Sequence, residues 1–252
     1  MPRERVPAAE PHPNPAPVNT PVNTPSNTPT PTNAPPPPTP VQAWSEVHAQ
    51  DVSHSRLATA WITLVHRLAP HLDQVPPDLL SAAGVLTTAA ALPAAAAGHH
   101  WPLLSLLLLI TAALLDGLDG AVAIRTNKVR PLGAVVDAVA DRLSDLCLLA
   151  VLVLLGAPER LATAVGAALF LHEYARARAQ GVGLTGAAAV TIAERPTRVI
   201  VVAVACLGAG TWPEGAPWFG WSWGALCLWL WAAISAIGGA HLAIALTRAL
   251  RQ

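Results

Sequence analysis

The chain has 252 residues, of which 53% are hydrophobic and 12% are charged, and its formal net charge at pH 7 is zero. A balanced charge provides no basic surface, so the chain is not expected to bind nucleic acid, and three cysteines without paired spacing exclude a disulfide framework. So apolar a composition favours an integral membrane protein with a polar tail over a soluble domain.

Residues 1–50 form the first segment, a tail rich in proline, threonine and asparagine. Fifteen of the twenty-five prolines lie within the first forty residues, which contain almost no large side chains. Proline and small polar residues cannot bury enough apolar surface to fold, so the tail is predicted to be disordered with polyproline character. We assign it no chemistry.

Residues 51–75 are predicted to be an amphipathic juxtamembrane segment. Within it, residues 56–72 combine apolar side chains at helical spacing with a few polar ones. The apolar positions are Leu57, Trp61, Leu64 and Leu68, and the polar ones are Arg56, His66 and Arg67. Two interpretations remain open, a helix lying on the membrane surface and a helix packed against the rest of the protein.

Residues 76–252 are predicted to be an all-α transmembrane domain. About six apolar stretches approach the roughly 20 residues that a helix needs to cross a bilayer. They cover residues 79–98, 102–124, 132–155, 160–180, 196–212 and 222–247. The fold class is therefore an all-α, polytopic membrane protein preceded by an interfacial helix and a disordered tail.

The basic residues predict how these spans are oriented. With a cytoplasmic N-terminus, nearly every arginine and lysine of the domain lies on the cytoplasmic side. These are Arg125, Lys128, Arg130, Arg176, Arg178, Arg195, Arg198, Arg248 and Arg251. Because cytoplasmic loops are enriched in basic residues, both termini are predicted to be cytoplasmic. We expect a protein of a bacterial-type cell membrane, with its active site facing the cytoplasm.

Four aspartates stand in otherwise apolar sequence between residues 114 and 146. Asp116 and Asp119 lie near the end of the second predicted span, and Asp137 and Asp141 lie near the start of the third. Residues three or four apart share one face of a helix. Since the connection between the two spans is short, the helices are expected to be antiparallel neighbours whose four carboxylates converge.

Such carboxylates predict a site for divalent cations. Charges inside a membrane are unfavourable unless an opposite charge compensates them. Carboxylate oxygens on fixed helices suit Mg²⁺ or Mn²⁺, and a pair of these ions can activate a hydroxyl and neutralise a leaving diphosphate. The alternative is the ion site of a cation-coupled membrane transporter, which predicts internally repeated halves. No such repeat is detected in the sequence.

The spacing of these residues closely resembles the signature of the CDP-alcohol phosphatidyltransferases. The matching positions are seven small or acidic residues within twenty-six, namely Asp116, Asp119, Gly120, Ala123, Gly133, Asp137 and Asp141. Similarity extends to the stretches PPDLLSAAG (76–84), EYARARAQGVG (173–183) and ERPTR (194–198). The last of these resembles the branch that makes phosphatidylinositol phosphate. One position departs from the family signature. Ile124 stands where the family usually has an arginine, and Arg125 follows it.

The resemblance implies an enzyme of phospholipid biosynthesis. It would transfer a phosphatidyl group from a CDP-lipid, CDP-diacylglycerol, to an alcohol acceptor and release CMP. Asp116, Asp119, Asp137 and Asp141 would bind two Mg²⁺ or Mn²⁺ ions, and Asp141 would also act as the general base. The implied CDP-binding residues are Gly120, Ala123, Arg125 and Gly133, although one step along a helix turns the Arg125 side chain by about 100° from the family position.

The acceptor implied by the resemblance is a small phosphorylated polyol such as inositol phosphate or glycerol phosphate. Arg176, Arg195 and Arg198 would bind it, since guanidinium groups suit phosphate oxygens. An enzyme acting on diacylglycerol or a second lipid and an inactive scaffold remain as alternatives. Membrane lipids and a second copy of the chain, in a homodimer, are further partners that the resemblance implies.

Two charged residues that follow the fourth aspartate on the same helix also carry expectations. Asp145 is expected to be the structural partner of a nearby basic residue and not a metal ligand. Arg142 either neutralises the aspartate cluster or pairs with Asp145. The sequence does not separate these two roles for Arg142.

Overall fold

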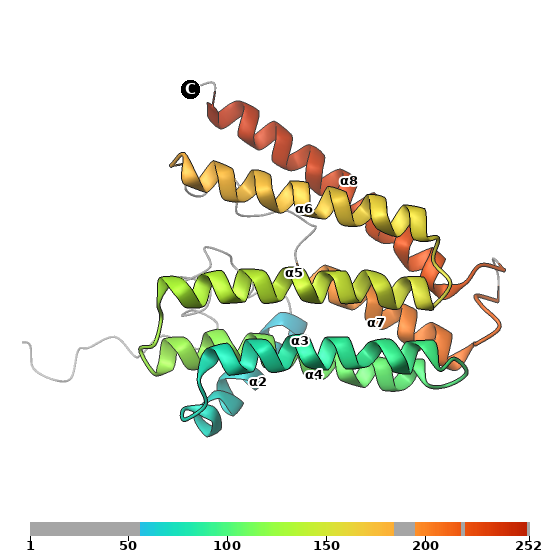
Figure 1. Ribbon diagram of the computed structural model, residues 1–252, viewed down its shortest axis with the longest axis horizontal. Coiled ribbons are helices and arrows are strands. Elements are labelled where there is room, and N and C mark those ends of the chain that lie inside the picture. Colours follow the sequence, from blue (N-terminus) through green and yellow to red (C-terminus); the bar gives the residue numbers. More distant parts are fainter. Residues whose placement is uncertain (1–55, 184–194, 218–219, 251–252) are drawn as a thin grey trace, which may run out of the picture. The chain divides into compact units, whose positions relative to one another are not determined.

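The computed structural model describes residues 56–183, 195–217 and 220–250, and the predicted tail at residues 1–50 lies outside these ranges. Every regular element in the described ranges is a helix (Figure 1). The α-helices are α2 (Arg56–Leu68), α3 (Pro77–Ala96), α4 (Pro102–Arg125), α5 (Pro131–Leu154), α6 (Glu159–Gly181), α7 (Arg195–Thr211) and α8 (Trp223–Leu250), and the 3₁₀ helix η2 (Ala69–Leu72) follows α2. The predicted all-α class is confirmed.

The helices lie where the apolar stretches predict them. The six predicted spans correspond to α3 through α8, and no end differs by more than three residues. Helices α3, α4 and α5 each begin with a proline, at Pro77, Pro102 and Pro131. Proline suits the first turn because its missing N–H would have no partner within the helix there. Proline therefore indicates in the sequence where these three helices begin.

Three of these helices are long and apolar enough to cross a membrane. They are Pro77–Ala96, Pro102–Arg125 and Trp223–Ala249, judged by length and composition. Helix α7 has 17 residues, and α5 and α6 carry many of the charged residues described below. The structure therefore supports three spans directly, and the other three stay predictions.

A single apolar core joins helices α3 through α8. Its fully buried side chains include Leu109 of α4, Leu148 and Leu152 of α5, Val202 of α7 and Leu228 of α8. Helix α3 packs along both α4 and α5, α7 packs against α4 and α8, and α6 runs beside α8 (Figure 1). These contacts hold the ends of α4, α5 and α7 that carry the charged residues close together.

Two glycines allow α8 to begin close to its neighbours. A side chain at Gly208 of α7 would overlap the ring of Trp223, the first residue of α8. A side chain at Gly224 would overlap the carbonyl oxygens of Leu152 and Leu155, at the end of α5. Small residues permit such close helix contacts in membrane proteins.

Helix α2 packs against the end of α4 with one face. Val65 of α2 and Ala69 of η2 are buried in a small cluster with Leu118 and Val122 of α4. Trp61, one turn before Val65, is exposed on the surface. The packed interpretation of this segment is therefore supported, and its position on a membrane surface stays a prediction.

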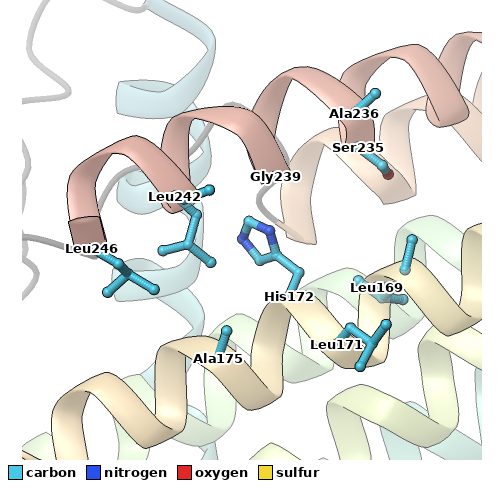
Figure 2. A pocket seen from close by; sticks show the side chains of 11 residues that line it. Leu169, Leu171, His172, Ala175, Ser235, Ala236, Gly239, Leu242 and Leu246 are labelled. Atoms are coloured by element: carbon cyan, nitrogen blue, oxygen red, sulfur yellow. The ribbon is translucent and has the colours of Figure 1, made fainter.

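One cavity lies between α6 and α8, and none of the aspartates lines it. It has a volume of about 430 Å³ and is lined mainly by alanine, leucine and glycine. Figure 2 shows the His172 ring reaching from α6 into this space, across from Gly239 and Leu242 of α8. Its lining carries two polar side chains, His172 and Ser235, so the cavity does not suit a charged diphosphate.

Candidate active site

Three of the four predicted aspartates lie together, two on α4 and one on α5. Asp116, Asp119 and Asp137 each offer a carboxylate oxygen, and the three oxygens lie within 4.8 Å of one another. Asp119 is buried, Asp116 is half-buried and Asp137 is exposed, so the group is open on one side. Three hard oxygen ligands with an open side fit a Mg²⁺ or Mn²⁺ ion that also binds phosphate oxygens.

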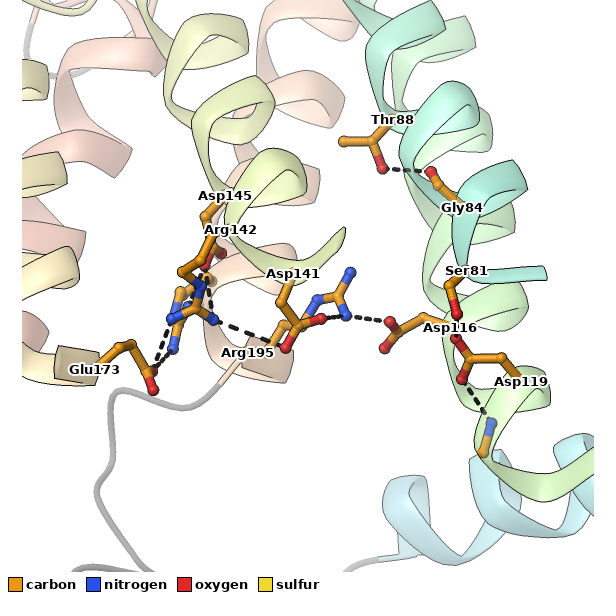
Figure 3. A network of polar contacts seen from close by, with 12 residues as sticks. Ser81, Gly84, Thr88, Asp116, Asp119, Asp141, Arg142, Asp145, Glu173 and Arg195 are labelled. Carbon is orange, nitrogen blue, oxygen red and sulfur yellow. Dashed lines mark hydrogen bonds and ion pairs between the residues drawn. The ribbon is translucent and has the colours of Figure 1, made fainter. Parts of the chain in front are cut away.

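Asp119 is fixed by two hydrogen bonds. The Ser81 hydroxyl of α3 donates to Asp119 Oδ2 at 2.5 Å, and the Gly120 backbone N–H donates to Asp119 Oδ1 at 2.6 Å (Figure 3). Partners of this kind hold a ligand in one orientation and tune its affinity for a metal. Helix α3 thus supports the aspartate cluster through Ser81.

The fourth aspartate lies beside this group and is joined to it by an arginine. Arg195, the first residue of α7, donates from Nη1 to Asp116 Oδ1 and also to Asp141 Oδ1 (Figure 3). Arg195 was predicted to bind the acceptor, and the structure places it between two of the aspartates. We name Asp116, Asp119, Asp137, Asp141 and Arg195 the acidic region.

A second group of charges surrounds Glu173 of α6. Glu173 lies 2.9 Å from Arg198 of α7, 3.2 Å from Arg142 of α5 and 3.6 Å from Arg176 of α6. Asp145 of α5 lies 2.6 Å from Arg198 and 3.1 Å from Arg142. We name these five residues the arginine region, because three guanidinium groups here face two carboxylates.

The arginine region has a buried part and an accessible part. The Asp145 side chain is fully buried and that of Arg198 is 4% exposed, whereas Arg142, Arg176 and Glu173 are between 21% and 25% exposed. Asp145 is the partner of basic residues, as expected. Arg142 contacts Asp145 and lies 3.7 Å from Asp141, so it fills both of the roles that the sequence left open.

Residues 74–237 match the sequence profile of the CDP-alcohol phosphatidyltransferases, which is more than half of the chain. The chain belongs to this family. The signature positions lie on α4 and α5 of this family member, around the acidic region. Membership argues against the transporter alternative, because the aspartates that would form its ion site belong to the family signature.

A curated relative indicates which branch of the family the chain resembles. Archaetidylinositol phosphate synthase of Pyrococcus horikoshii is 39% identical over 98 residues, which are 38% of this chain and 50% of the relative. The chain thus spans about half the length of the curated relative that it matches. The matched relative belongs to the branch that the ERPTR segment of this family member resembles.

Two crystal structures of phosphatidylinositol phosphate synthase from Mycobacterium tuberculosis have a similar fold. The one in complex with manganese and citrate is 24% identical, with a TM-score of 0.59 over 72% of this chain and 88% of that chain. The one with CDP-DAG bound is 25% identical, with a TM-score of 0.57 over 73% and 94%. The helices of this family member are therefore arranged as in a known phosphatidyltransferase fold.

Among the predicted CDP-binding residues, Gly120 adjoins the acidic region, whereas Gly133 lies beside Arg130 and Asp78. Gly120 follows Asp119 directly, and a side chain there would meet no atom within 4 Å, so space is open beside it. Arg125, in contrast, forms a two-pronged ion pair with Asp73, at 3.0 and 2.9 Å. This guanidinium lowers the pKa of Asp73 below its ordinary value. This ion pair is exposed to solvent. Binding of the diphosphate by Arg125 stays a prediction.

Sequence reasoning assigned no partner to two residues of the site. Ser81 lies in the PPDLLSAAG stretch that resembles the family, but its partner Asp119 is 38 residues away. Glu173 carries a weak signal, since it stands three residues before Arg176 on α6, which is the spacing of an ion pair on a helix. Its contacts with Arg142 and Arg198 depend on how three helices pack.

Proposed function

We propose that this protein is an integral membrane enzyme that transfers a phosphatidyl group from CDP-diacylglycerol to the hydroxyl of an alcohol, with release of CMP. One observation carries this proposal, the group of three carboxylates from Asp116, Asp119 and Asp137 at the family signature. The bound CDP-DAG of the structural neighbour supports a CDP-lipid as donor. Basic residues gathered beside the carboxylates support a polar acceptor.

Asp116, Asp119 and Asp137 would hold Mg²⁺ or Mn²⁺, with Asp141 as a further ligand of the second ion of a pair. Ions bound by these residues would supply positive charge for the diphosphate and would make the acceptor hydroxyl more acidic. The aspartates orient the donor, and Ser81 keeps Asp119 in place. The manganese of the structural neighbour supports this metal assignment.

Asp141 would accept the proton of the acceptor hydroxyl. The hydroxyl oxygen then forms a bond to the phosphorus of the phosphatidyl group, and the bond from that phosphorus to the CMP oxygen breaks. CMP leaves with the electron pair of the broken bond. Arg195 supports this role, because its contacts with Asp116 and Asp141 hold the base beside the donor site.

The acceptor would be a small phosphorylated polyol such as inositol phosphate or glycerol phosphate. Of these two acceptors, inositol phosphate is the better supported, because the curated relative is an archaetidylinositol phosphate synthase and the structural neighbours are phosphatidylinositol phosphate synthases. Arg176 and Arg198 belong to the arginine region, which would bind the phosphate, and Arg142 joins them there. Arg195 belongs to the acidic region and would reach the acceptor from that side.

The proposed enzyme has six membrane spans, with both termini and the active site on the cytoplasmic side. The distribution of arginine and lysine supports this orientation. The polar acceptors and CMP are water-soluble, so a cytoplasmic opening agrees with their supply and release. A homodimer stays a prediction from the family.

Release of CMP tests the function. Purified protein in lipid vesicles is given CDP-diacylglycerol and, separately, inositol phosphate, glycerol phosphate, inositol or diacylglycerol, with Mg²⁺, Mn²⁺ or a chelator. We expect CMP only when a divalent cation and a phosphorylated polyol are both present, and none from an Asp119→Asn variant. Turnover in the chelator, or none with any acceptor, would contradict the proposal.

A further inference from the structure

Glu173 occupies the centre of the arginine region. Its carboxylate contacts guanidinium groups from three helices, those of Arg142 on α5, Arg176 on α6 and Arg198 on α7. Guanidinium groups pair with carboxylates and phosphates through the same donor geometry. Glu173 therefore stands where an anionic ligand of these three arginines would bind.

The accessible part of the region lies on the side of Glu173. Asp145 and Arg198 are buried, whereas Glu173, Arg142 and Arg176 are each more than one-fifth exposed. A ligand arriving from solvent would meet these three side chains first. The carboxylate that it would have to replace is thus that of Glu173, and not that of Asp145.

The arginines also have donors that Glu173 does not use. Within the described residues, the Nε atoms of Arg142 and Arg176 are buried and have no hydrogen-bond partner. Each guanidinium has five N–H donors, and a buried donor without a partner is unfavourable. A ligand with three or four oxygens would satisfy more of these donors than the two oxygens of one carboxylate.

Charge points to the same ligand. Three arginines against Asp145 and Glu173 leave a net charge of one positive unit, and without Glu173 the remainder is two positive units. A phosphate monoester carries a charge of about −1.5 to −2 near neutral pH, which matches the region only when Glu173 is displaced. Both the number of donors and the charge therefore favour a phosphate in place of Glu173.

We propose that Glu173 is an internal competitor of the acceptor's phosphate group. It holds Arg142, Arg176 and Arg198 together in the place of the anion, and a phosphorylated acceptor binds by displacing it. Glu173 thereby sets the affinity for the acceptor without touching the CDP-lipid. This inference rests on the proposed function, because it concerns the same acceptor site.

Binding of inorganic phosphate tests the competition without any turnover. Full-length protein in detergent is titrated with phosphate, and binding is followed by the rise in unfolding temperature. We expect Glu173→Gln, which keeps the shape of the side chain and removes its charge, to bind phosphate about tenfold more tightly than wild type, since competing interactions are typically coupled by factors of this size. Unchanged or weaker binding by this variant would overturn the proposal.

Two further variants are titrated with phosphate in the same way. Glu159→Gln removes one negative charge from the exposed start of the same helix and should bind phosphate as wild type does. Glu173→Asp keeps the charge on a shorter side chain, so it should compete less well and bind phosphate more tightly than wild type. If the glutamine variant does not fold, wild-type affinity in the aspartate variant would overturn the proposal instead.

Turnover separates this inference from the proposed function. In Glu173→Gln we expect a lower KM for the phosphorylated acceptor and an unchanged KM for CDP-diacylglycerol. A raised KM for the acceptor would mean that Glu173 positions the arginines for the phosphate, which overturns the proposal. If wild-type protein releases no CMP, the proposed function fails, and the phosphate titration still decides the role of Glu173.

Discussion

The acidic region and the arginine region lie side by side and carry opposite surplus charge. The first holds four carboxylates and one guanidinium, and the second holds three guanidinium groups and two carboxylates. A site with surplus negative charge attracts cations, and one with surplus positive charge attracts phosphate. The pair therefore suits a reaction in which a metal-bound diphosphate meets a phosphorylated acceptor.

Helix α5 separates the two regions by one turn. Asp141 belongs to the acidic region and Asp145, four residues later, belongs to the arginine region. Arg142 lies between them and is within ion-pair distance of both carboxylates. Two carboxylates one helical turn apart thus face different groups of charges, Asp141 facing Arg195 and Asp145 facing Arg198.

Removing the proposed base should have the largest effect. Asp141→Asn is expected to reduce CMP release by about 10²–10⁴-fold, because general-base catalysis contributes that much. Binding of CDP-diacylglycerol should remain, since Asp116, Asp119 and Asp137 are intact. Equilibrium binding and single-turnover rates measured on the same preparation separate the two effects. A variant that turns over at the wild-type rate would remove Asp141 from the mechanism.

Breaking the buried pair of the arginine region should destabilise the protein. Arg198→Ala leaves Asp145 fully buried with one fewer partner, and loss of one member of a buried ion pair costs about 3–5 kcal/mol. Equilibrium unfolding in mixed detergents measures the loss. Arg178→Ala, an exposed change on α6, should stay within about 0.5 kcal/mol of wild type. Equal stability of the two variants would contradict the structural importance of Arg198.

Removing the hydrogen bond that holds Asp119 should weaken metal binding and leave the arginine region unchanged. Ser81→Ala removes the hydroxyl that holds Asp119, and losses of this kind typically reduce metal affinity by about 10–100-fold. Calorimetric titration with Mn²⁺ provides the measurement. Thr87→Ala is the matched control, because the Thr87 hydroxyl bonds to the backbone of its own helix α3. Wild-type affinity in Ser81→Ala would mean that the Ser81 hydroxyl does not support metal binding by Asp119.

Reducing the accessible positive charge should affect the acceptor alone. Arg176→Gln is expected to raise the KM of the phosphorylated acceptor about tenfold, since a hydrogen bond to a charged group contributes roughly 1.5–3 kcal/mol. The KM of CDP-diacylglycerol should not change. Steady-state kinetics with each substrate varied in turn measures both values. A parallel rise in both would place Arg176 outside the acceptor site.

An exposed ion pair outside both regions provides the smallest effect. Arg125 lowers the pKa of Asp73, so the pair stabilises the folded protein above the ordinary aspartate pKa and ceases to do so as the pH falls through the lowered value. Asp73→Asn should therefore unfold at a slightly lower temperature than wild type at neutral pH. The difference should disappear in acid. A difference in unfolding temperature that grows on acidification would contradict the stabilising role of this ion pair.

Most of the fold and half of the site could be read from local sequence. Apolar stretches predict α3 to α8, and proline marks the starts of α3, α4 and α5, because these signals act within a few residues. The aspartate spacing predicts that Asp116 and Asp119 share a face. Nothing local indicates that Arg195 pairs with Asp116, which is 79 residues away, or that Arg198 is buried against Asp145, 53 residues away.

The helices, the helix faces that carry the aspartates and the family can all be predicted from local patterns along the chain. Helical periodicity is a property of each segment, so it needs no knowledge of the neighbours. The packing of the helices, in contrast, sets which carboxylate each arginine contacts and places Glu173 among three arginines. A guanidinium on a long flexible side chain can reach several partners, and the packing of α4, α5, α6 and α7 selects among them.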